Sequence, residues 1–530
     1  MFFAYAFTLL TVMCACTSSS YGPSSTAYSA AGTTRGAMRR VKAEPGSVLV
    51  CPSPAPVGIS AVEVITASPL GRNRHTESYA AVKENAFVRT AAQPVSTFGA
   101  DVDTASYANV RRLIRSGAEI PGGAVRLEEM VNYFPYEYPQ PAPGQPFAVS
   151  MESAECPWQQ GDRVLKIALR TREVDPASRP AANLVFLVDV SGSMDERNKL
   201  PLVKKGLQIL TDGLRAEDRI AMVSYAGNSG LVLPATPGDR RSTIRQAIRR
   251  LDAGGSTNGG EGIELAYRVA RENFIPGGVN RVILATDGDF NVGITGEMAL
   301  QRLIETKAKS GVFLSVLGFG MGNLKDSTLE MLADKGNGNY AYIDSAEEAG
   351  KVLGTDATGT LLTVAKDVKL QIEWNPAAAR RYRLLGYENR VMANEDFAND
   401  RRDSGDMGAG QRVTVLYQYE PAGASGLLAT LRIRHKLPEA SQSTIAVFTC
   451  PAGVTNSFAQ AGEDFRFSAA VTAFGLLLRG SPHTGSATRE SVLDWAGGAR
   501  GRDPGGLRRE FVSLAGKAIL PQLPVPTAQR

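Results

Sequence analysis

The feature that most constrains the fold is a series of short apolar segments between residues 184 and 319, separated by stretches with helical periodicity. The apolar segments show no polar alternation, which is typical of strands buried on both faces of a parallel sheet. These segments are Leu184–Val188, Ile220–Tyr225, Val282–Thr286 and Leu314–Phe319. The helical stretches are Leu200–Leu214, Thr243–Leu251, Gly262–Asn273, Met298–Lys309 and Leu324–Lys335. Strands that alternate with helices predict an α/β fold with a central, doubly wound, mostly parallel sheet.

Polar side chains follow two of these predicted strands. Asp189, Ser191 and Ser193 come directly after the first strand, and Asp287 follows the third. A loop of small residues before another helix contributes Thr257. Ligands of open parallel sheets bind beyond the carboxyl ends of the strands, so we expect these side chains to meet there. Two carboxylates and three hydroxyls suit a hard cation such as Mg²⁺, which prefers octahedral oxygen coordination at about 2.0–2.1 Å.

These five residues together resemble the metal-ion-dependent adhesion site of the von Willebrand factor type A family, whose pattern is DxSxS, then a Thr, then an Asp after a later strand. The resemblance implies a Rossmann-like domain at residues 182–345. It also implies that Ser191, Ser193 and Thr257 ligate metal directly, while Asp189 and Asp287 do so directly or through water. The implied cation is Mg²⁺, Mn²⁺ or Ca²⁺, with an open coordination position for an Asp or Glu of a protein partner. Because Asp and Ser are common N-caps, helix capping without metal is the alternative interpretation.

The segments on either side resemble a bacterial lipoprotein subfamily of the same family. The similar segments are Ser96–Tyr107, Glu128–Phe134, Thr360–Leu361, Ala365–Val368 and Leu385–Arg390. The resemblance implies an N-terminal flanking region, at residues 79–181, and a C-terminal domain of unassigned function, at residues 346–528. Within the latter, Leu361–Trp374, Arg412–Glu420 and Leu428–His435 alternate as half-buried antiparallel strands do. We therefore expect a separate α+β or β-rich domain there.

The first residues resemble a bacterial lipoprotein signal. An apolar run of about a dozen residues, too short to span a bilayer, precedes Ala15-Cys16. In this interpretation residues 1–15 are a signal peptide, Cys16 is lipid-modified, and residues 16–78 form a disordered tether rich in Ser, Thr, Ala, Gly and Pro. We expect export and membrane anchoring, at the periplasmic face or in the cell envelope. No Lys or Arg precedes the apolar run and Cys14 is a competing acceptor, so a plain secretory signal and a cytoplasmic chain are the alternatives.

Composition argues against several other classes. The net charge of +5 is not gathered into a Lys/Arg block, which argues against a nucleic-acid partner. The three histidines lie far apart, which argues against a histidine-rich metal site; they are His75, His435 and His483. Cys51, Cys156 and Cys450 form no CxxC pair, so we expect no structural zinc, while one disulfide among them stays open.

We therefore expect a metal-dependent protein-binding protein of adhesion or scaffold type, and not an enzyme. Metal-assisted hydrolysis needs a base beside the metal-bound water, and the only nearby candidate, Glu261, begins a predicted helix. One alternative is a hydrolase of the aspartate-phosphatase type, because Asp101 and Asp103 are similar to its nucleophile motif. Ala105 departs from that motif, and we expect the two acids to cap the following helix or to form a turn. The other alternative is a docking subunit of an ATP-driven machine, against which the export signal argues.

Overall fold

The computed structural model describes residues 76–227, 229–255, 259–288, 297–424, 426–452 and 457–521. The predicted signal peptide, Cys16, all but the last residues of the predicted tether, and Thr257 lie outside these ranges. Within the described ranges, no helix is long and apolar enough to cross a membrane.

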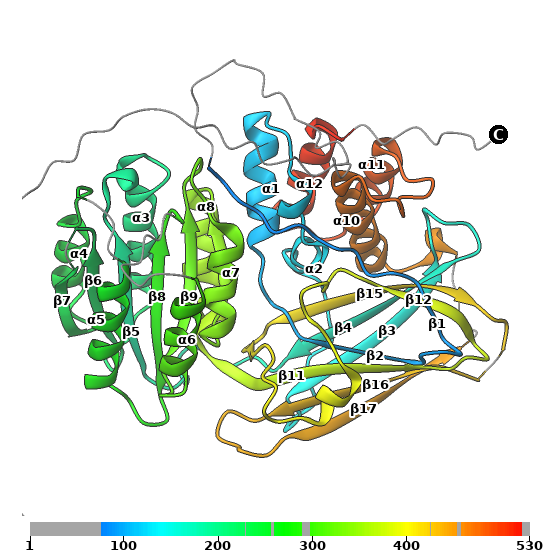
Figure 1. The fold of residues 1–530 in the computed structure, drawn as a ribbon, viewed down its shortest axis with the longest axis horizontal. Helices are drawn as coiled ribbons and strands as arrows, with labels where there is room; N and C mark the ends of the chain where they lie inside the picture. The colour runs from blue at the N-terminus through cyan, green and yellow to red at the C-terminus, as the bar shows by residue number, and fades with distance from the viewer. Residues whose placement is uncertain are drawn as a thin grey trace, which may run out of the picture. The chain divides into compact units, whose positions relative to one another are not determined.

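A six-stranded sheet in the order β10-β9-β8-β5-β6-β7 forms the α/β part of the chain (Figure 1). Its strands are β5 (Ala182–Asp189), β6 (Arg219–Tyr225), β7 (Ser229–Pro237), β8 (Val279–Thr286), β9 (Phe313–Phe319) and β10 (Tyr340–Ile343). All neighbours pair in parallel except β6 and β7. Strands β5 and β8 are buried at every position, which explains their uninterrupted apolar sequences. The predicted doubly wound, mostly parallel sheet is therefore confirmed.

Helices cover both faces of this sheet. One apolar core holds side chains of α3 (Leu200–Asp212), α4 (Arg241–Arg249) and α8 (Ala346–Gly350). The core on the opposite face holds side chains of α5 (Gly259–Glu272), α6 (Glu297–Ala308) and α7 (Asp326–Lys335). A π-helix (Lys351–Thr355) and α9 (Ala357–Leu361) follow α8 and also contribute to the first core. Gly206 of α3 leaves room for Leu353, whose Cδ1 would lie only 2.8 Å from an added Cβ.

Two antiparallel sheets form a sandwich from the flanking regions of the chain (Figure 1). One has the order β1-β12-β15-β4-β3, with β1 (Val88–Arg89), β12 (Ala379–Leu385), β15 (Arg412–Pro421), β4 (Arg163–Thr171) and β3 (Phe147–Glu155). The other has the order β13-β2-β11-β16-β17, with β13 (Val391–Met392), β2 (Val95–Gly99), β11 (Thr363–Trp374), β16 (Gly426–Lys436) and β17 (Thr444–Ala452), and β14 (Met407–Gly408) pairs with β11. Apolar side chains from both sheets fill the space between them.

The two flanking regions do not fold separately. Strand β4, from the N-terminal side, pairs with β15, and β2 pairs with β11, from the C-terminal side. Each strand of these pairs would otherwise expose a row of unpaired backbone N–H and C=O groups, which strands from the opposite end of the chain satisfy. The C-terminal part that we expected to be a separate domain therefore shares both sheets with the N-terminal flanking region.

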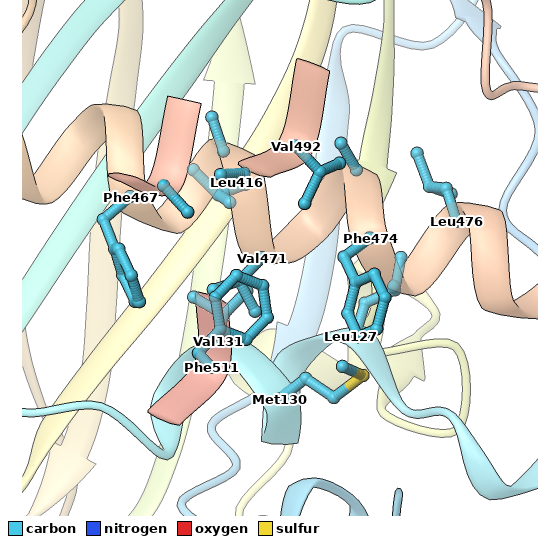
Figure 2. Close-up of a cluster of buried hydrophobic side chains, with 14 of the residues drawn as sticks. Leu127, Met130, Val131, Leu416, Phe467, Val471, Phe474, Leu476, Val492 and Phe511 are labelled. Carbon is cyan, nitrogen blue, oxygen red and sulfur yellow. The ribbon is translucent and has the colours of Figure 1, made fainter. Parts of the chain in front are cut away.

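A helical layer covers the outer face of the β1-β12-β15-β4-β3 sheet. It consists of α1 (Ala105–Ser116), α2 (Leu127–Asn132), α10 (Glu463–Arg479), α11 (Arg489–Gly497) and α12 (Leu507–Lys517). Figure 2 shows Val471 and Phe474 of α10 beside Met130 of α2, Phe511 of α12 and Leu416 of β15. Full burial of such side chains stabilises the fold by about 1.5–3 kcal/mol each. Helix α10 is buried on nearly all sides and is therefore a core helix of this layer.

Asp101 and Asp103 do not cap helix α1, so that prediction was wrong. The N-cap residue is Thr104, which makes no side-chain capping hydrogen bond. Instead, an Asp103 carboxylate oxygen accepts the backbone N–H of Tyr340 at 2.8 Å, and Asp101 pairs with Arg390 at 3.1 Å. Both acids are buried and tie the start of α1 to β10 and to the sandwich.

The two cysteines in the described part of the chain are buried free thiols, Cys156 and Cys450. Burial raises the pKa of Cys156 to about 12 and that of Cys450 to about 11. Both thiols therefore stay protonated at neutral pH and behave as small apolar side chains.

Candidate metal centre

Asp189 is the last residue of β5 and has no exposed surface. One carboxylate oxygen accepts the backbone N–H of Ser191 at 2.9 Å, and the other accepts the hydroxyls of Tyr225 at 3.1 Å and Thr286 at 3.0 Å. Burial, together with the nearby carboxylate of Asp287, raises the pKa of Asp189 to about 6 against the effect of these hydrogen bonds. The Asp189 carboxylate is therefore held in one orientation from three sides.

The loop after β5 turns through a short 3-10 helix that brings two hydroxyls together. Met194 anchors this loop in the α/β core, and the backbone N–H of Gly192 donates to the carbonyl of Gly255 at 3.1 Å. The Oγ atoms of Ser191 and Ser193 lie 3.1 Å apart. Ser191 is buried whereas Ser193 is exposed, so this pair of hydroxyls leads from the interior to the surface.

Asp287 directly follows β8, which pairs with β5, so the two acids sit at the same edge of the sheet. Its Oδ2 accepts a hydrogen bond from the ammonium of Lys199 at 3.1 Å. Burial alone raises the pKa of Asp287, but hydrogen bonds with Asn323 and Ser193 and the charge of Lys199 outweigh burial and lower the pKa overall. Asp287 is therefore an anion that already carries a cationic partner.

Sequence reasoning missed Lys199. Its side chain is 3% exposed, and an added Cβ on Gly320 would lie 2.4 Å from its Cε, so the aliphatic stem is tightly enclosed. A signal for it existed, because Lys199 is the N-cap residue of α3. A cation is unfavourable at the positive end of a helix dipole, so a buried lysine there indicates another role.

The segment after β9, Gly320–Lys325, forms what we call the rim loop. Its Asn323 accepts a hydrogen bond from Lys199 at 3.4 Å, which places the loop against the two acids. Gly288, next to Asp287, has φ +95°, and an added Cβ would lie 2.6 Å from the backbone nitrogen of Lys325. A glycine is therefore required for this close approach of the rim loop.

The donor set fits a small, hard cation. Octahedral coordination at about 2.0–2.1 Å separates neighbouring ligand oxygens by about 3 Å, and the two serine hydroxyls are 3.1 Å apart. Among the described residues, no cluster of three or more His, Cys, Asp or Glu side chains is arranged to hold a metal ion. A cation here would therefore depend on the hydroxyls as well as on Asp189 and Asp287.

The structure thus brings four of the five predicted ligands together, and Thr257 lies outside the described residues. Glu261 is an exposed residue in the first turn of α5, as expected for a residue that begins a helix. His435 lies on β16 of the sandwich and packs edge-on against Phe147, so it belongs to a different part of the fold.

Comparison with known proteins agrees with this architecture. Residues 183–354 match the von Willebrand factor type A domain family, and residues 73–166 match a family described as von Willebrand factor. Residues 359–427 and 422–520 match the C-terminal family of the uncharacterized protein YfbK. The chain is 43% identical to YfbK of Escherichia coli (strain K12) over 469 residues, which cover 83% of this chain and 81% of that protein. The chain belongs to the YfbK family.

Other similarities of this YfbK family member are more limited. Inter-alpha-trypsin inhibitor heavy chain H3 of Homo sapiens is 29% identical over 165 residues, which cover 29% of this chain and 18% of that protein. Among solved structures, a von Willebrand factor type A protein from Catenulispora acidiphila aligns with 18% identity and a TM-score of 0.41, over 72% of this chain and 93% of that one. Proteins with von Willebrand factor type A domains typically bind other proteins.

Proposed function

We propose that this chain is an adhesion- or scaffold-type protein that binds a carboxylate group of a protein partner through a divalent cation. The observation that carries the proposal is the meeting of Asp189, Ser191, Ser193 and Asp287 at the carboxyl ends of β5 and β8. Together with Thr257 they would hold Mg²⁺, or Mn²⁺ or Ca²⁺ in its place. The cation would supply a coordination position to which an Asp or Glu oxygen of the partner binds.

Lys199 supports an anionic ligand for this centre. When a divalent cation is bound, the two carboxylates neutralise it and the Lys199 ammonium leaves one net positive charge. A positive potential in a recessed site attracts an anion and disfavours a cationic ligand. Exposed Ser193 marks the side from which a partner would approach.

We further propose that the chain is exported and anchored in a membrane through lipid on Cys16. The sequence at Ala15-Cys16 supports this address, and an envelope location would give the centre access to extracytoplasmic partners. The docking role on an ATP-driven machine would require a cytoplasmic chain. No observation favours a phosphatase, because Asp101 and Asp103 are buried in ion pairs with Arg390.

Metal binding is tested by titration calorimetry of the whole chain with Mn²⁺ and with Mg²⁺. We expect one site in the wild type, strongly weakened binding in Asp189→Ala, and wild-type binding in the control Asp252→Ala, which changes an exposed acid. Equal binding by wild type and Asp189→Ala would exclude this centre.

Partner binding is tested by capture from cell-envelope extract with immobilised chain, in Mg²⁺ or in EDTA. Capture should require Mg²⁺ and should be lost in Thr257→Ala, while Thr306→Ala, an exposed threonine on α6, should behave as wild type. Capture that neither EDTA nor Thr257→Ala reduces would assign partner binding to another surface.

A further inference from the structure

The rim loop is held from outside the α/β part of the chain. The segment Thr76–Tyr79, which we call the strap, runs beside it, and Ser78 forms a parallel bridge with Lys325. The backbone N–H of Thr76 donates to the carbonyl of Gly322 at 2.6 Å, and that of Ser78 donates to the carbonyl of Leu324 at 3.0 Å. The strap therefore fixes the rim loop on both sides of Asn323.

Glu77 adds a side-chain contact to these backbone contacts. Its Oε1 accepts the backbone N–H of Gly322 at 2.6 Å. Arg112 of α1 holds the same carboxylate through two hydrogen bonds, of 3.0 Å to Oε1 and 2.9 Å to Oε2, and the Tyr79 hydroxyl donates to Oε2 at 2.8 Å. Glu77 and Arg112 are only 11% and 10% exposed, and a two-point pair of this kind is directional.

The rim loop needs such support because it has little structure of its own. Gly320 and Gly322 both adopt positive φ, of +75° and +95°, and the residue between Gly322 and Leu324 is Asn323. Glycine restricts a loop less than any other residue, so contacts from elsewhere must select one conformation. Asn323 in turn contacts Lys199 and Asp287. A continuous set of contacts thus joins Arg112, Glu77 and the rim loop to the metal centre.

We propose that Glu77, held by Arg112, is a positioning residue of the metal centre: it fixes Gly322 so that Asn323 and Lys199 stay on Asp287. This inference rests on the proposed metal-binding function. Groups that orient ligands without touching the ion alter metal affinity by about 10–100-fold when they are removed. Glu77 would act at the lower end of this range, because it works through a loop rather than on a ligand directly.

The test compares Mn²⁺ affinity by calorimetry for the whole chain and three variants. Glu77→Ala should weaken Mn²⁺ binding about tenfold, and Glu77→Gln, which keeps an acceptor for the Gly322 N–H, should lose about threefold. The control is Glu388→Ala, because Glu388 is also 11% exposed and pairs with a buried arginine, Arg479, at 2.6 Å. This control should lower the melting temperature as much as Glu77→Ala does, with wild-type Mn²⁺ affinity.

A second measurement separates this inference from the function on which it rests. Amide hydrogen exchange at Gly322 reports the contact with Glu77 whether or not metal binds. Faster exchange in Glu77→Ala but not in Glu388→Ala supports positioning of the loop, even if the wild type fails to bind Mn²⁺ and the proposed function falls. Wild-type exchange at Gly322 in Glu77→Ala, or wild-type Mn²⁺ affinity in that variant, would overturn the inference.

Discussion

The Lys199 ammonium lies 3.1 Å from Asp287 Oδ2, and both side chains are almost completely buried. A lysine so placed supplies, within the protein, part of the positive charge that the two acids require. The centre can therefore stay folded without a divalent cation, and with one it carries a net positive charge. Lys199 thereby opposes the metal and favours an anionic ligand at the same time.

Replacing Lys199 by Met should separate these two effects. Without metal, the variant leaves a buried carboxylate without its cation, and the free energy of unfolding should fall by about 3 kcal/mol. Because repulsion between ammonium and metal is removed, Mn²⁺ affinity should rise about tenfold, and added Mn²⁺ should raise the melting temperature more than in the wild type. Calorimetry and thermal unfolding with EDTA or Mn²⁺ measure both. Lys205→Met, an exposed change on the same helix, is the control, and unchanged Mn²⁺ affinity in Lys199→Met would contradict the prediction.

Replacing Gly288 by Ala should strain the contact between the metal centre and the rim loop. The residue combines φ +95° with a predicted Cβ distance of 2.6 Å to the backbone of Lys325. We expect a loss of about 3 kcal/mol in the free energy of unfolding, from positive φ and from the clash. Gly311→Ala isolates the first effect, because φ there is +82° but the nearest atoms, of Phe274, are 3.5 Å away. Urea unfolding of the two variants should differ clearly, and equal losses would mean that the rim loop yields freely.

Stability should depend on the pH through Asp406. Burial, with the neighbouring Asp403, raises the pKa of Asp406 to about 7, although the backbone N–H of Asp367 donates to it. Its folded pKa is above its unfolded value, so its contribution is complete below the unfolded pKa and is lost as the pH rises through 7. Between pH 5 and pH 8 the wild type should lose on the order of 2 kcal/mol relative to Asp406→Asn.

Urea unfolding at several pH values measures this difference. The asparagine keeps an oxygen that can accept the Asp367 N–H, so the variant should fold, and its stability should change less with pH. Asp494→Asn, at an exposed position on α11, should follow the wild type at every pH. Parallel curves for wild type and Asp406→Asn would show that Asp406 is ionised in the folded protein throughout this range.

The cellular address is tested by fractionation. If Cys16 carries the lipid, Cys16→Ser should move the chain from the membrane fraction to the soluble fraction, because acyl chains supply the membrane affinity. Cys14→Ser should leave the chain in the membrane fraction. A wild-type chain recovered only in the soluble fraction would contradict lipid anchoring.

Much of the α/β part was predictable because its strands are buried on both faces. Burial of this kind requires an uninterrupted apolar run, and β5 and β8 show it in any short window of sequence. Asp189 and Asp287 were predictable for a related reason, since a polar residue directly after such a strand must lie at the edge of the sheet. Edge strands carry weaker patterns, and β7 and β10 were not predicted.

The sequence by itself determined the class of sheet, the order of its strands and helices, and the oxygen donors at its edge, because all of these depend on local periodicity and on the residues directly after each strand. Only the tertiary structure decided that Lys199 pairs with Asp287 and that Glu77 holds the rim loop. It likewise decided that strands from both ends of the chain share one sandwich. These relationships join residues far apart in sequence, and their energies come from burial and charge pairing that no local pattern encodes.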